Sequence, residues 1–237
     1  MTQPLFRDDA YLQSCGGKVV ALTDDGIVLD SSLFYAQGGG QPGDSGWLVW
    51  DGAECAVTNA VKGEDDAIVL LSEPGATRPD MGQTVTQRLD WGRRHCHMRV
   101  HTALHLLSVV IPLPVSGGQI GAEKGRLDFD MPEALDDKDG LETRLNDLIA
   151  RDLPVSEDWI TDAELAANPG LIKTMSVMPP MGAGHVRLIR IGQGAEQIDL
   201  QPCGGTHVAR TGEIGRVRLG KVEKKGARNR RVYLHLA

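Results

Sequence analysis

The residues Arg93–Ile111, which read RRHCHMRVHTALHLLSVVI, decide how this chain is organised. The stretch has neither glycine nor proline, and the apolar residues Val100, Leu104 and Leu107 recur at the spacing of one helix face. Pro112 follows, and proline cannot continue a helix. We therefore predict a helix over Arg93–Ile111, and this helix separates two parts of the chain that differ in pattern.

The part before this helix, residues 1–90, reads as short strands between turns. The chain has 29 glycines and 12 prolines among 237 residues but only 4% aromatic residues, so we expect many turns and a mainly aliphatic core. Short apolar runs bounded by turn residues are typical of strands. The strand candidates are Val19–Leu22, Ile27–Leu29, Trp47–Trp50 and Ile68–Leu71. These runs predict a small β-barrel-like N-terminal domain.

The part from residue 91 onward mixes helical and strand patterns. Leu141–Leu153 carries leucine and isoleucine on one helix face and ends before Pro154, which predicts a second helix. Alternating residues predict strands at Leu127–Met131, at Val186–Ile191 and within 214–236. The expected fold class is α+β: the barrel-like domain is followed by a two-layer domain of helices packed on a mainly antiparallel sheet.

The composition is that of a globular protein, with 41% hydrophobic and 24% charged residues. No apolar run approaches the ~20 residues of a membrane-spanning helix, and the N-terminus lacks a basic segment followed by an apolar one. We therefore expect a cytoplasmic protein with no membrane partner. The four cysteines are widely scattered and indicate free thiols or a metal ligand, not a disulfide framework: Cys15, Cys55, Cys96 and Cys203.

Charge is distributed unevenly along the chain. The formal net charge is -7, yet residues 209–231 hold nine basic and two acidic residues. Such a basic segment on an acidic protein favours a local anion-binding face. A solvated strand surface would give the same composition, and charge alone does not separate the two interpretations.

Two short motifs together form a candidate metal site. HTALH, with His101 and His105, lies inside the first predicted helix, where residues four apart share one face. CGGTH, with Cys203 and His207, places two more ligands around a short glycine turn. Three imidazoles and one thiolate favour zinc. A helical zinc protease is disfavoured, because Thr102 stands where that motif has its glutamate.

The metal site could be structural or catalytic. Four protein ligands are typical of structural zinc, whereas catalytic zinc keeps one position open. The objection weakens if one ligand moves away or the coordination number rises when substrate binds. His95 and His97 precede the motif, and we interpret them as surface residues or as neighbours of the ligands, because only residues four apart face together.

A glycine-rich stretch, Gly38–Gly46, reads GGGQPGDSG. It is no Walker loop, since no Gly-Lys-Ser/Thr follows, and it lacks the spacing and context of a dinucleotide-binding motif. One interpretation is a tight turn that requires positive φ. The other is a backbone segment close to another surface, with Gln41 and Asp44 placed to form hydrogen bonds.

The motifs in this order resemble the editing domain of alanyl-tRNA synthetases and its free-standing relatives, the AlaX proteins. The resemblance runs from about residue 19 to the end. It rests on HTALH and CGGTH, on the glycine-rich stretch that follows Phe34 and Tyr35, and on HVARTGEIG (207–215) and KGARNRRV (225–232). The threonyl-tRNA synthetase editing domain shares the zinc-type motifs but lacks the glycine-rich partner domain, so the alanyl branch fits better.

The resemblance implies two domains: residues 1–90 form the N-terminal β domain with the glycine-rich motif, and residues 91–237 form a zinc-binding editing domain. It implies a trans-editing hydrolase of the medium-length class, without an aminoacylation domain. The substrate would be Ser-tRNA(Ala), with Gly-tRNA(Ala) a second candidate, and Ala-tRNA(Ala) would be spared. The implied partner is tRNA and not DNA, and the implied cofactor is one Zn²⁺ per chain.

The residues then take expected roles. The ligands are His101, His105, Cys203 and His207, and a zinc-bound water attacks the ester, since no Glu or Asp is an obvious base. Asp128 lies on an alternating strand and could point toward the ligands, although an exposed strand carboxylate is the commoner outcome. The remaining candidates are Thr102, Gln119 and Gln41 for substrate binding and Lys224, Lys225, Arg228, Arg230 and Arg231 for tRNA phosphates.

Two other functions compete with this prediction. The first is a zinc-dependent deacylase of another mischarged tRNA, such as Ser-tRNA(Thr). The second is a non-catalytic tRNA-binding module with a structural zinc, in which loss of a ligand would unfold the protein instead of only inactivating it.

Overall fold

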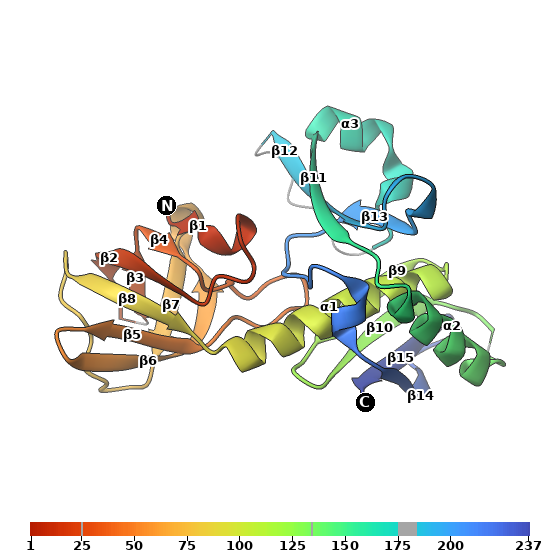
Figure 1. Cartoon of the computed structure of the whole chain (residues 1–237), viewed down its shortest axis with the longest axis horizontal. Helices are drawn as coiled ribbons and strands as arrows, with labels where there is room; N and C mark the ends of the chain where they lie inside the picture. Colours follow the sequence, from red (N-terminus) through yellow and green to blue (C-terminus); the bar gives the residue numbers. More distant parts are fainter. Residues whose placement is uncertain (25, 134, 175–183) are drawn as a thin grey trace. The chain divides into compact units, whose positions relative to one another are not determined.

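The computed structural model describes residues 1–24, 26–133, 135–174 and 184–237 and divides into two compact units, Met1–Cys96 and His97–Ala237 (Figure 1). Helix α1 spans Trp91–Val110, so its first turns belong to the first unit and the rest to the second. The predicted helix over Arg93–Ile111 is thereby confirmed to within two residues at each end.

The first unit is a closed antiparallel barrel. Its strands follow the order β2-β3-β7-β6-β5-β8 and every pairing is antiparallel. The barrel strands are β2 Ser14–Leu22, β3 Gly26–Leu29, β5 Gly46–Trp50, β6 Ala53–Lys62, β7 Ile68–Ser72 and β8 Thr84–Leu89. Two short parallel strands, β1 Gln3–Pro4 and β4 Ser31–Ser32, pair beside the barrel. The predicted β-barrel-like domain is confirmed.

Alternation along the strands fills the barrel with aliphatic side chains. Leu29, Leu48 and Leu70 have no exposed surface, and β8 alternates strictly between exposed and buried residues. All four predicted strands in this unit are confirmed. The patterns missed β6 and β8, because threonine, alanine and charged residues occupy their exposed positions and leave no continuous apolar run.

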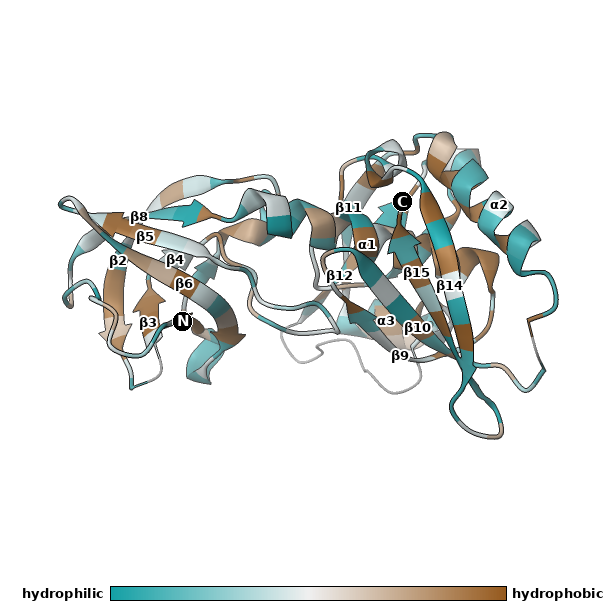
Figure 2. Cartoon of the chain, turned by 90° about the horizontal axis from the view of Figure 1, so that it is seen from below, coloured by the Kyte–Doolittle hydropathy of each residue, from teal (hydrophilic) through white to brown (hydrophobic). Residues whose placement is uncertain are grey.

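The second unit holds two antiparallel sheets. The larger follows the order β14-β15-β10-β9, and the smaller follows β11-β12-β13. The strands are β9 Val115–Ile120, β10 Lys124–Asp130, β11 Val155–Thr161, β12 His185–Ile191, β13 Asp199–Pro202, β14 Val217–Lys224 and β15 Asn229–Leu236. Figure 2 shows hydrophobic and hydrophilic colours alternating along β14, in step with the burial of its residues. The α+β fold class is confirmed.

Helix α1 packs closely on the four-stranded sheet at one glycine. A Cβ atom at Gly125 would lie 2.7 Å from Val100 Cγ1 and 2.9 Å from Leu104 Cδ1. The apolar stripe of α1 therefore rests on β10 at a distance that only glycine permits. His101 and His105 each follow a residue of this stripe, so the packing of the stripe fixes the rotation of the helix that presents them.

The second predicted helix is displaced by three residues. We expected Leu141–Leu153, whereas α2 spans Lys138–Ala150. Its start is set by Asp137, whose carboxylate accepts a hydrogen bond from the Gly140 N–H at 2.9 Å. Its end is set by Asp152, which has φ 48° and turns the chain out of the helix before Pro154 is reached.

The remaining short helices connect these elements. Helix α3 spans Asp162–Ala167 and starts with a capping box between Thr161 and Glu164. Single 3-10 turns occur at Leu5–Arg7, Glu64–Asp66, Pro169–Leu171, Gly194–Glu196 and Thr211–Ile214.

No helix among the described residues has the length and apolar character needed to cross a membrane.

Candidate metal centre

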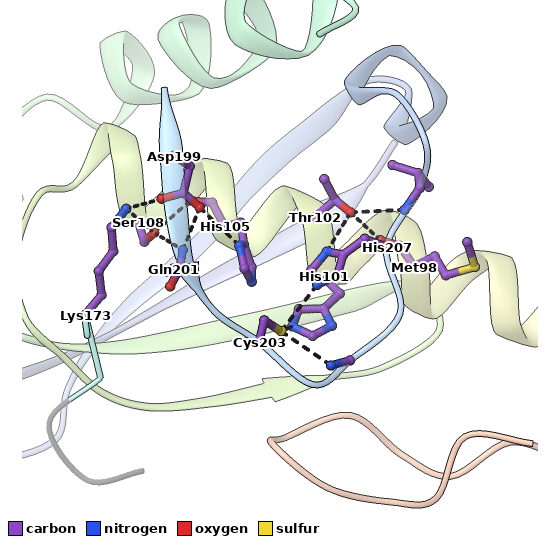
Figure 3. A network of polar contacts seen from close by, with 12 residues as sticks. Met98, His101, Thr102, His105, Ser108, Lys173, Asp199, Gln201, Cys203 and His207 are labelled. Atoms are coloured by element: carbon purple, nitrogen blue, oxygen red, sulfur yellow. Dashed lines mark hydrogen bonds and ion pairs between the residues drawn. The ribbon is translucent and has the colours of Figure 1, made fainter. Parts of the chain in front are cut away.

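The four side chains of the two motifs meet in the second unit. His101 and His105 lie one turn apart on α1, and Cys203 and His207 lie on the loop that follows β13 (Figure 3). One donor atom from each lies within 4.8 Å of the others. The three histidines are 6% to 7% exposed, and Cys203 is the member with appreciable exposure. The spacing argument thus correctly predicted which four residues converge.

Two of the donor separations match those around one tetrahedral ion. Cys203 Sγ lies 3.4 Å from His101 Nε2 and 3.3 Å from His207 Nε2. Tetrahedral zinc with a Zn–S bond of about 2.3 Å and a Zn–N bond of about 2.0 Å separates sulfur and nitrogen by about 3.5 Å. The agreement and the mixed nitrogen and sulfur donor set both favour a zinc-type ion at this cluster.

Contacts around His207 leave its Nε2 atom with a lone pair. The Thr102 hydroxyl donates its single proton to the Met98 carbonyl at 3.0 Å, as hydroxyls in helices commonly do. The same oxygen lies 3.1 Å from His207 Nδ1, so it accepts a proton from that nitrogen. The Val208 N–H donates to it as well, at 3.3 Å. Thr102 therefore fixes the Nδ1–H form of His207 and orients Nε2 toward Cys203.

A buried carboxylate fixes His105 in the same way. Asp199 Oδ2 lies 3.1 Å from His105 Nδ1 and accepts a hydrogen bond from Gln201 Nε2 at 2.7 Å. Its other oxygen pairs with Lys173 Nζ at 2.5 Å. A carboxylate that holds the far nitrogen of a ligating histidine is a recurrent feature of metal sites, and it sets both tautomer and ring orientation.

The CGGTH loop is held by a buried arginine. Arg187, on β12 and 7% exposed, donates from Nη1 to the carbonyls of Cys203 and Gly205 at 2.9 and 2.8 Å. Its Nη2 pairs with Glu157 on β11. The Gly205 N–H in turn lies 3.5 Å from Cys203 Sγ. The sheet therefore dictates where the loop places its sulfur.

The electrostatics of the cluster suit a cation. Burial opposes a thiolate, but the His101 and His207 rings lower the pKa of Cys203 well below its usual value. Burial also lowers the pKa of His207 well below 6.5. Burial alone would lower the pKa of His105, but Asp199 and Cys203 raise it to about 9. Metal binding to such a cluster exchanges the His105 proton for the cation.

Asp128 has other partners. Its carboxylate accepts hydrogen bonds from Arg231 Nε at 2.8 Å and from Arg126 Nη1 at 2.7 Å, across the four-stranded sheet. Gln119, on β9 and exposed, accepts from Arg126 Nε at 3.2 Å. The carboxylate that contacts a histidine of the cluster is Asp199. Roles for Asp128 beside the ligands and for Gln119 in substrate binding stay predictions.

Three of the basic residues predicted to bind tRNA are paired with carboxylates. Lys225 Nζ lies 2.8 Å from Glu223 Oε2, and Arg228 Nη2 lies 2.9 Å from Asp130 Oδ2. Arg231 is the partner of Asp128 described above. These pairs reduce the positive charge that the segment presents.

The other two basic residues lie on adjoining strands. Lys224 is exposed at the end of β14, and its register partner on β15 is Arg230. Arg230 is partly buried and donates from Nη2 to the Pro132 carbonyl at 3.1 Å. The most exposed side chain among the ion pairs of this segment is that of Arg228, at 71%.

The glycine-rich stretch forms a tight turn in the first unit. Gly39 and Gly40 have φ of 56° and 83°, and the N–H of Gly38 and the N–H of Gln41 each donate to the other residue's carbonyl at 3.1 and 2.9 Å. The tight-turn interpretation is confirmed. Gln41 is 1% exposed. Its part in substrate binding stays a prediction.

The two histidines before the motif differ in environment. His95 stacks against Trp91 with ring centroids 5.2 Å apart, and His97 is 2% exposed. Neither belongs to the four-residue cluster. The residues near the cluster that the motifs did not reveal include Asp199, Lys173, Gln201 and Arg187. No local pattern marks Asp199, because its contact with His105 follows from where β13 lies beside α1.

Two family models match the chain. One, described as the threonyl and alanyl tRNA synthetase second additional domain, matches residues 186–233. The other, described as class II (A) tRNA synthetases, matches residues 11–93. The first match contains the CGGTH loop, and the second contains the glycine-rich turn.

Named relatives match over the whole chain. The alanyl-tRNA editing protein AlaX-M of Methanosarcina acetivorans is 36% identical over 248 residues, which cover 100% of this chain and 99% of the relative. That of Saccharolobus solfataricus is 32% identical and covers 98% of each. The alanine-tRNA ligase of Pyrobaculum calidifontis is 36% identical over 94% of this chain but only 25% of the ligase. This chain therefore belongs to the AlaX-M family of alanyl-tRNA editing proteins.

Proposed function

We propose that this chain is a zinc-dependent hydrolase that removes serine from mischarged alanine tRNA, accepts the glycine ester as a second substrate, and spares Ala-tRNA(Ala). The observation that carries the proposal is the cluster of four donor side chains with two of its histidines fixed by Thr102 and Asp199. Membership in a family of alanyl-tRNA editing proteins supplies the class of substrate.

The residues of the chain prepare the site for ester hydrolysis. His101, His105, Cys203 and His207 hold the ion, and Thr102, Asp199 and Arg187 fix the ligands in place. Bound zinc supplies a Lewis acid that polarises a carbonyl and lowers the pKa of water. Asp199 engages His105, Gln201 and Lys173, so it acts on the ligand and not as a base on the substrate.

Discrimination against alanine follows from the serine hydroxyl. A site that hydrogen-bonds a hydroxyl rejects the substrate that lacks it, because buried polar groups would otherwise stay unpaired. The Thr102 hydroxyl is engaged with Met98, His207 and Val208, so its contacts support positioning of His207. We propose that the ion or the Gln119 amide reads the serine hydroxyl. Equal rates on serine and glycine esters would contradict this assignment.

The tRNA backbone is proposed to contact the basic segment through Lys224, Lys225 and Arg228, with Arg230 and Arg231 behind them. Such contacts make the affinity for tRNA fall as the salt concentration rises. The slope of log affinity against log salt concentration is about -1 for each phosphate contact. Because three of these residues are already paired with carboxylates, we expect a shallow slope of about -2 to -3. An affinity independent of salt between 50 and 200 mM would contradict this part of the proposal.

The two units are proposed to divide the work, with residues 1–90 as the N-terminal β domain that carries the glycine-rich turn and residues 91–237 as the editing domain. The decisive experiment measures deacylation by the zinc-loaded chain on four substrates in parallel: Ser-tRNA(Ala), Gly-tRNA(Ala), Ala-tRNA(Ala) and Ser-tRNA(Thr). Rapid loss of serine from alanine tRNA, with alanine retained, is expected.

Other outcomes would favour the alternatives. Faster loss from Ser-tRNA(Thr) than from Ser-tRNA(Ala) would make the chain a deacylase of another mischarged tRNA. Binding of all four without loss of any amino acid would make it a tRNA-binding module with a structural metal ion.

A further inference from the structure

An exposed tryptophan lies in line with the metal-binding cysteine across the three-stranded sheet. Trp159 on β11 is the register partner of Arg187 on β12. The next pairing along β12 joins Leu188 to Pro202, and the Cys203 N–H donates to the Arg187 carbonyl at 3.1 Å. Trp159, Arg187 and Cys203 therefore form one row across the sheet, and two strand spacings of about 4.8 Å separate the backbones of its ends by about 10 Å.

The side chain of Trp159 belongs to the face of the sheet that carries the site. Residues directly opposite in an antiparallel pair point to the same face, so Trp159 and Arg187 do. Glu157, two residues before Trp159, confirms this because it pairs with the Arg187 guanidinium. By the same alternation Asp199, which holds His105, is on this face too.

On this face the side chains of β12 and β13 are buried, whereas the edge strand β11 is exposed at both Glu157 and Trp159. Ile189, Ile191 and Asp199 are at most 3% exposed and Arg187 is 7% exposed, whereas the Trp159 side chain is 52% exposed. Among the described residues, the other large hydrophobic side chains with comparable exposure are Met1, Val20, Leu22 and Met81, all in the first unit and none aromatic. Trp159 is thus an exposed aromatic side chain on the edge strand of the sheet that carries Arg187 and Asp199, in a chain where only 4% of residues are aromatic.

We propose that the Trp159 indole is the stacking platform for the base of the terminal nucleoside whose ribose carries the ester, an inference that rests on the proposed function. An indole offers a broad apolar face on which any base can stack, and such stacking is a common means of holding single-stranded ends. Glu157 is neutralised by Arg187, so the neighbouring carboxylate does not repel the nucleotide backbone.

The dimensions fit this assignment. Five covalent bonds of about 1.5 Å separate the ester carbon from the glycosidic nitrogen of the same nucleoside. An ester held at the Cys203 end of the row therefore places its own base, and no more distant nucleotide, over the indole. Arg187 lies beneath the ribose in this arrangement and keeps its contacts with the CGGTH loop.

The test compares two seryl esters that differ only in the base. One is seryl-adenosine, and the other carries serine on the same ribose ring without a base. We expect the zinc-loaded wild-type chain to prefer the adenosine ester by between about 5-fold and 100-fold in kcat/KM. Trp159→Leu should erase the preference, mainly through KM, and leave the rate on the base-less ester unchanged. Trp159→Phe should retain most of it.

A binding measurement makes the test independent of catalysis. Tryptophan fluorescence is followed while a short RNA with an unpaired terminal adenosine, or the same RNA with an abasic end, is added. Quenching by the first RNA should exceed that by the second and disappear in Trp159→Leu. Trp47→Leu is the matched control, because Trp47 lies in the first unit under Arg88 and should change neither preference nor affinity.

Each outcome decides the matter. A Trp159→Leu chain that keeps the base preference, or that loses activity equally on both esters, overturns the proposal. A wild-type chain that binds both RNAs equally overturns it as well. A wild-type chain that cleaves no mischarged tRNA but shows Trp159-dependent quenching contradicts the proposed function and leaves the stacking site standing.

Discussion

This protein has two buried clusters of polar side chains, the Arg94–Asp44 ion pair in the first unit and the four-residue cluster in the second. They differ in whether residues of the chain satisfy all their charges and hydrogen bonds. In the first unit, Arg94 and Asp44 are 0% and 1% exposed, and they form an ion pair. Arg94 also donates to the carbonyls of Ala10 and Leu33 at 2.9 and 2.7 Å, and Asp44 accepts from the Tyr35 N–H at 2.5 Å. Charge and hydrogen bonds are satisfied there by the chain alone.

The four-residue cluster in the second unit differs, because its polar atoms point toward one another. The outer contacts of His105 and His207, with Asp199 and Thr102, direct the remaining ring nitrogens toward Cys203. Four side chains of the kind that ligate metals thus converge in one group of the described residues. A buried ion pair whose hydrogen bonds are completed by the chain stabilises a fold, whereas a buried group of potential ligand atoms specifies a ligand.

The largest expected effect comes from removing one of the four side chains of the cluster. We expect His105→Ala to lose its metal and to lower kcat/KM on Ser-tRNA(Ala) by ~10³-fold or more, because a Lewis acid contributes several kcal/mol to such a reaction. Metal content and single-turnover deacylation are measured together. His235→Ala on β15 is the matched control and should keep both. A His105→Ala chain that is unfolded by circular dichroism would favour a structural ion.

Breaking the Arg94–Asp44 ion pair should lower the stability of the protein and leave metal binding unchanged. Arg94→Met strands the Asp44 carboxylate in the core of the first unit, and we expect a loss of about 3–5 kcal/mol in the free energy of unfolding. Urea unfolding followed by tryptophan fluorescence measures it, since Trp47, Trp50 and Trp91 lie in that unit.

The double variant tests the cause of that loss. Arg94→Met with Asp44→Leu removes both charges and should recover part of the stability, because a buried pair contributes little beyond its own desolvation. No recovery in the double variant would show that the other hydrogen bonds of Arg94 dominate. Zinc bound per chain should match wild type in both variants.

Altering an outer contact of the cluster should have an intermediate effect. Asp199→Asn weakens the hold on His105 Nδ1, and we expect zinc to dissociate ~10- to 100-fold more readily in competition with a chelator. Nitrogen NMR of His105 should show the Nδ1–H form in wild type and a mixture in the variant. Lys173→Met should shift the zinc affinity in the same direction by a smaller factor.

The control for this prediction is Asp128→Asn, which makes the same change to a carboxylate that is held by two arginines of the four-stranded sheet. Its zinc affinity should equal that of wild type. If Asp199→Asn, Lys173→Met and Asp128→Asn all bind zinc with the same affinity, Asp199 is only a packing residue.

The comparison also shows what the sequence could and could not reveal. Spacing alone predicted that these four side chains converge, since i and i+4 on a helix and a short glycine loop each constrain two of them locally. The partner of Asp44 could not be predicted in this way, because Arg94 lies fifty residues away and reaches it through the barrel fold.

The contacts that orient the ligands depend on register and on packing. Asp128 alternates as a strand residue should, but its partner Arg231 is set by the pairing of β10 with β15. Thr102 is adjacent to a ligand in sequence, yet its role follows from the Met98 carbonyl and from where the loop brings His207. Local patterns therefore identified the donors, and the tertiary fold determined what fixes them.

The smallest expected effect concerns Asp128 and the two arginines that contact it, Arg231 and Arg126. Burial alone would raise the pKa of Asp128, but Arg231 and Arg126 hold it below its usual value. A carboxylate whose pKa is lowered by folding stabilises the protein above its unfolded-state pKa of about 3.9, and this contribution is lost as pH falls through the folded-state pKa. Asp128→Asn should therefore lower the free energy of unfolding by about 1 kcal/mol or less at pH 7. Urea titrations should show the difference from wild type shrinking below pH 4, and a difference that is the same at both pH values would mean that packing, not charge, gives Asp128 its effect.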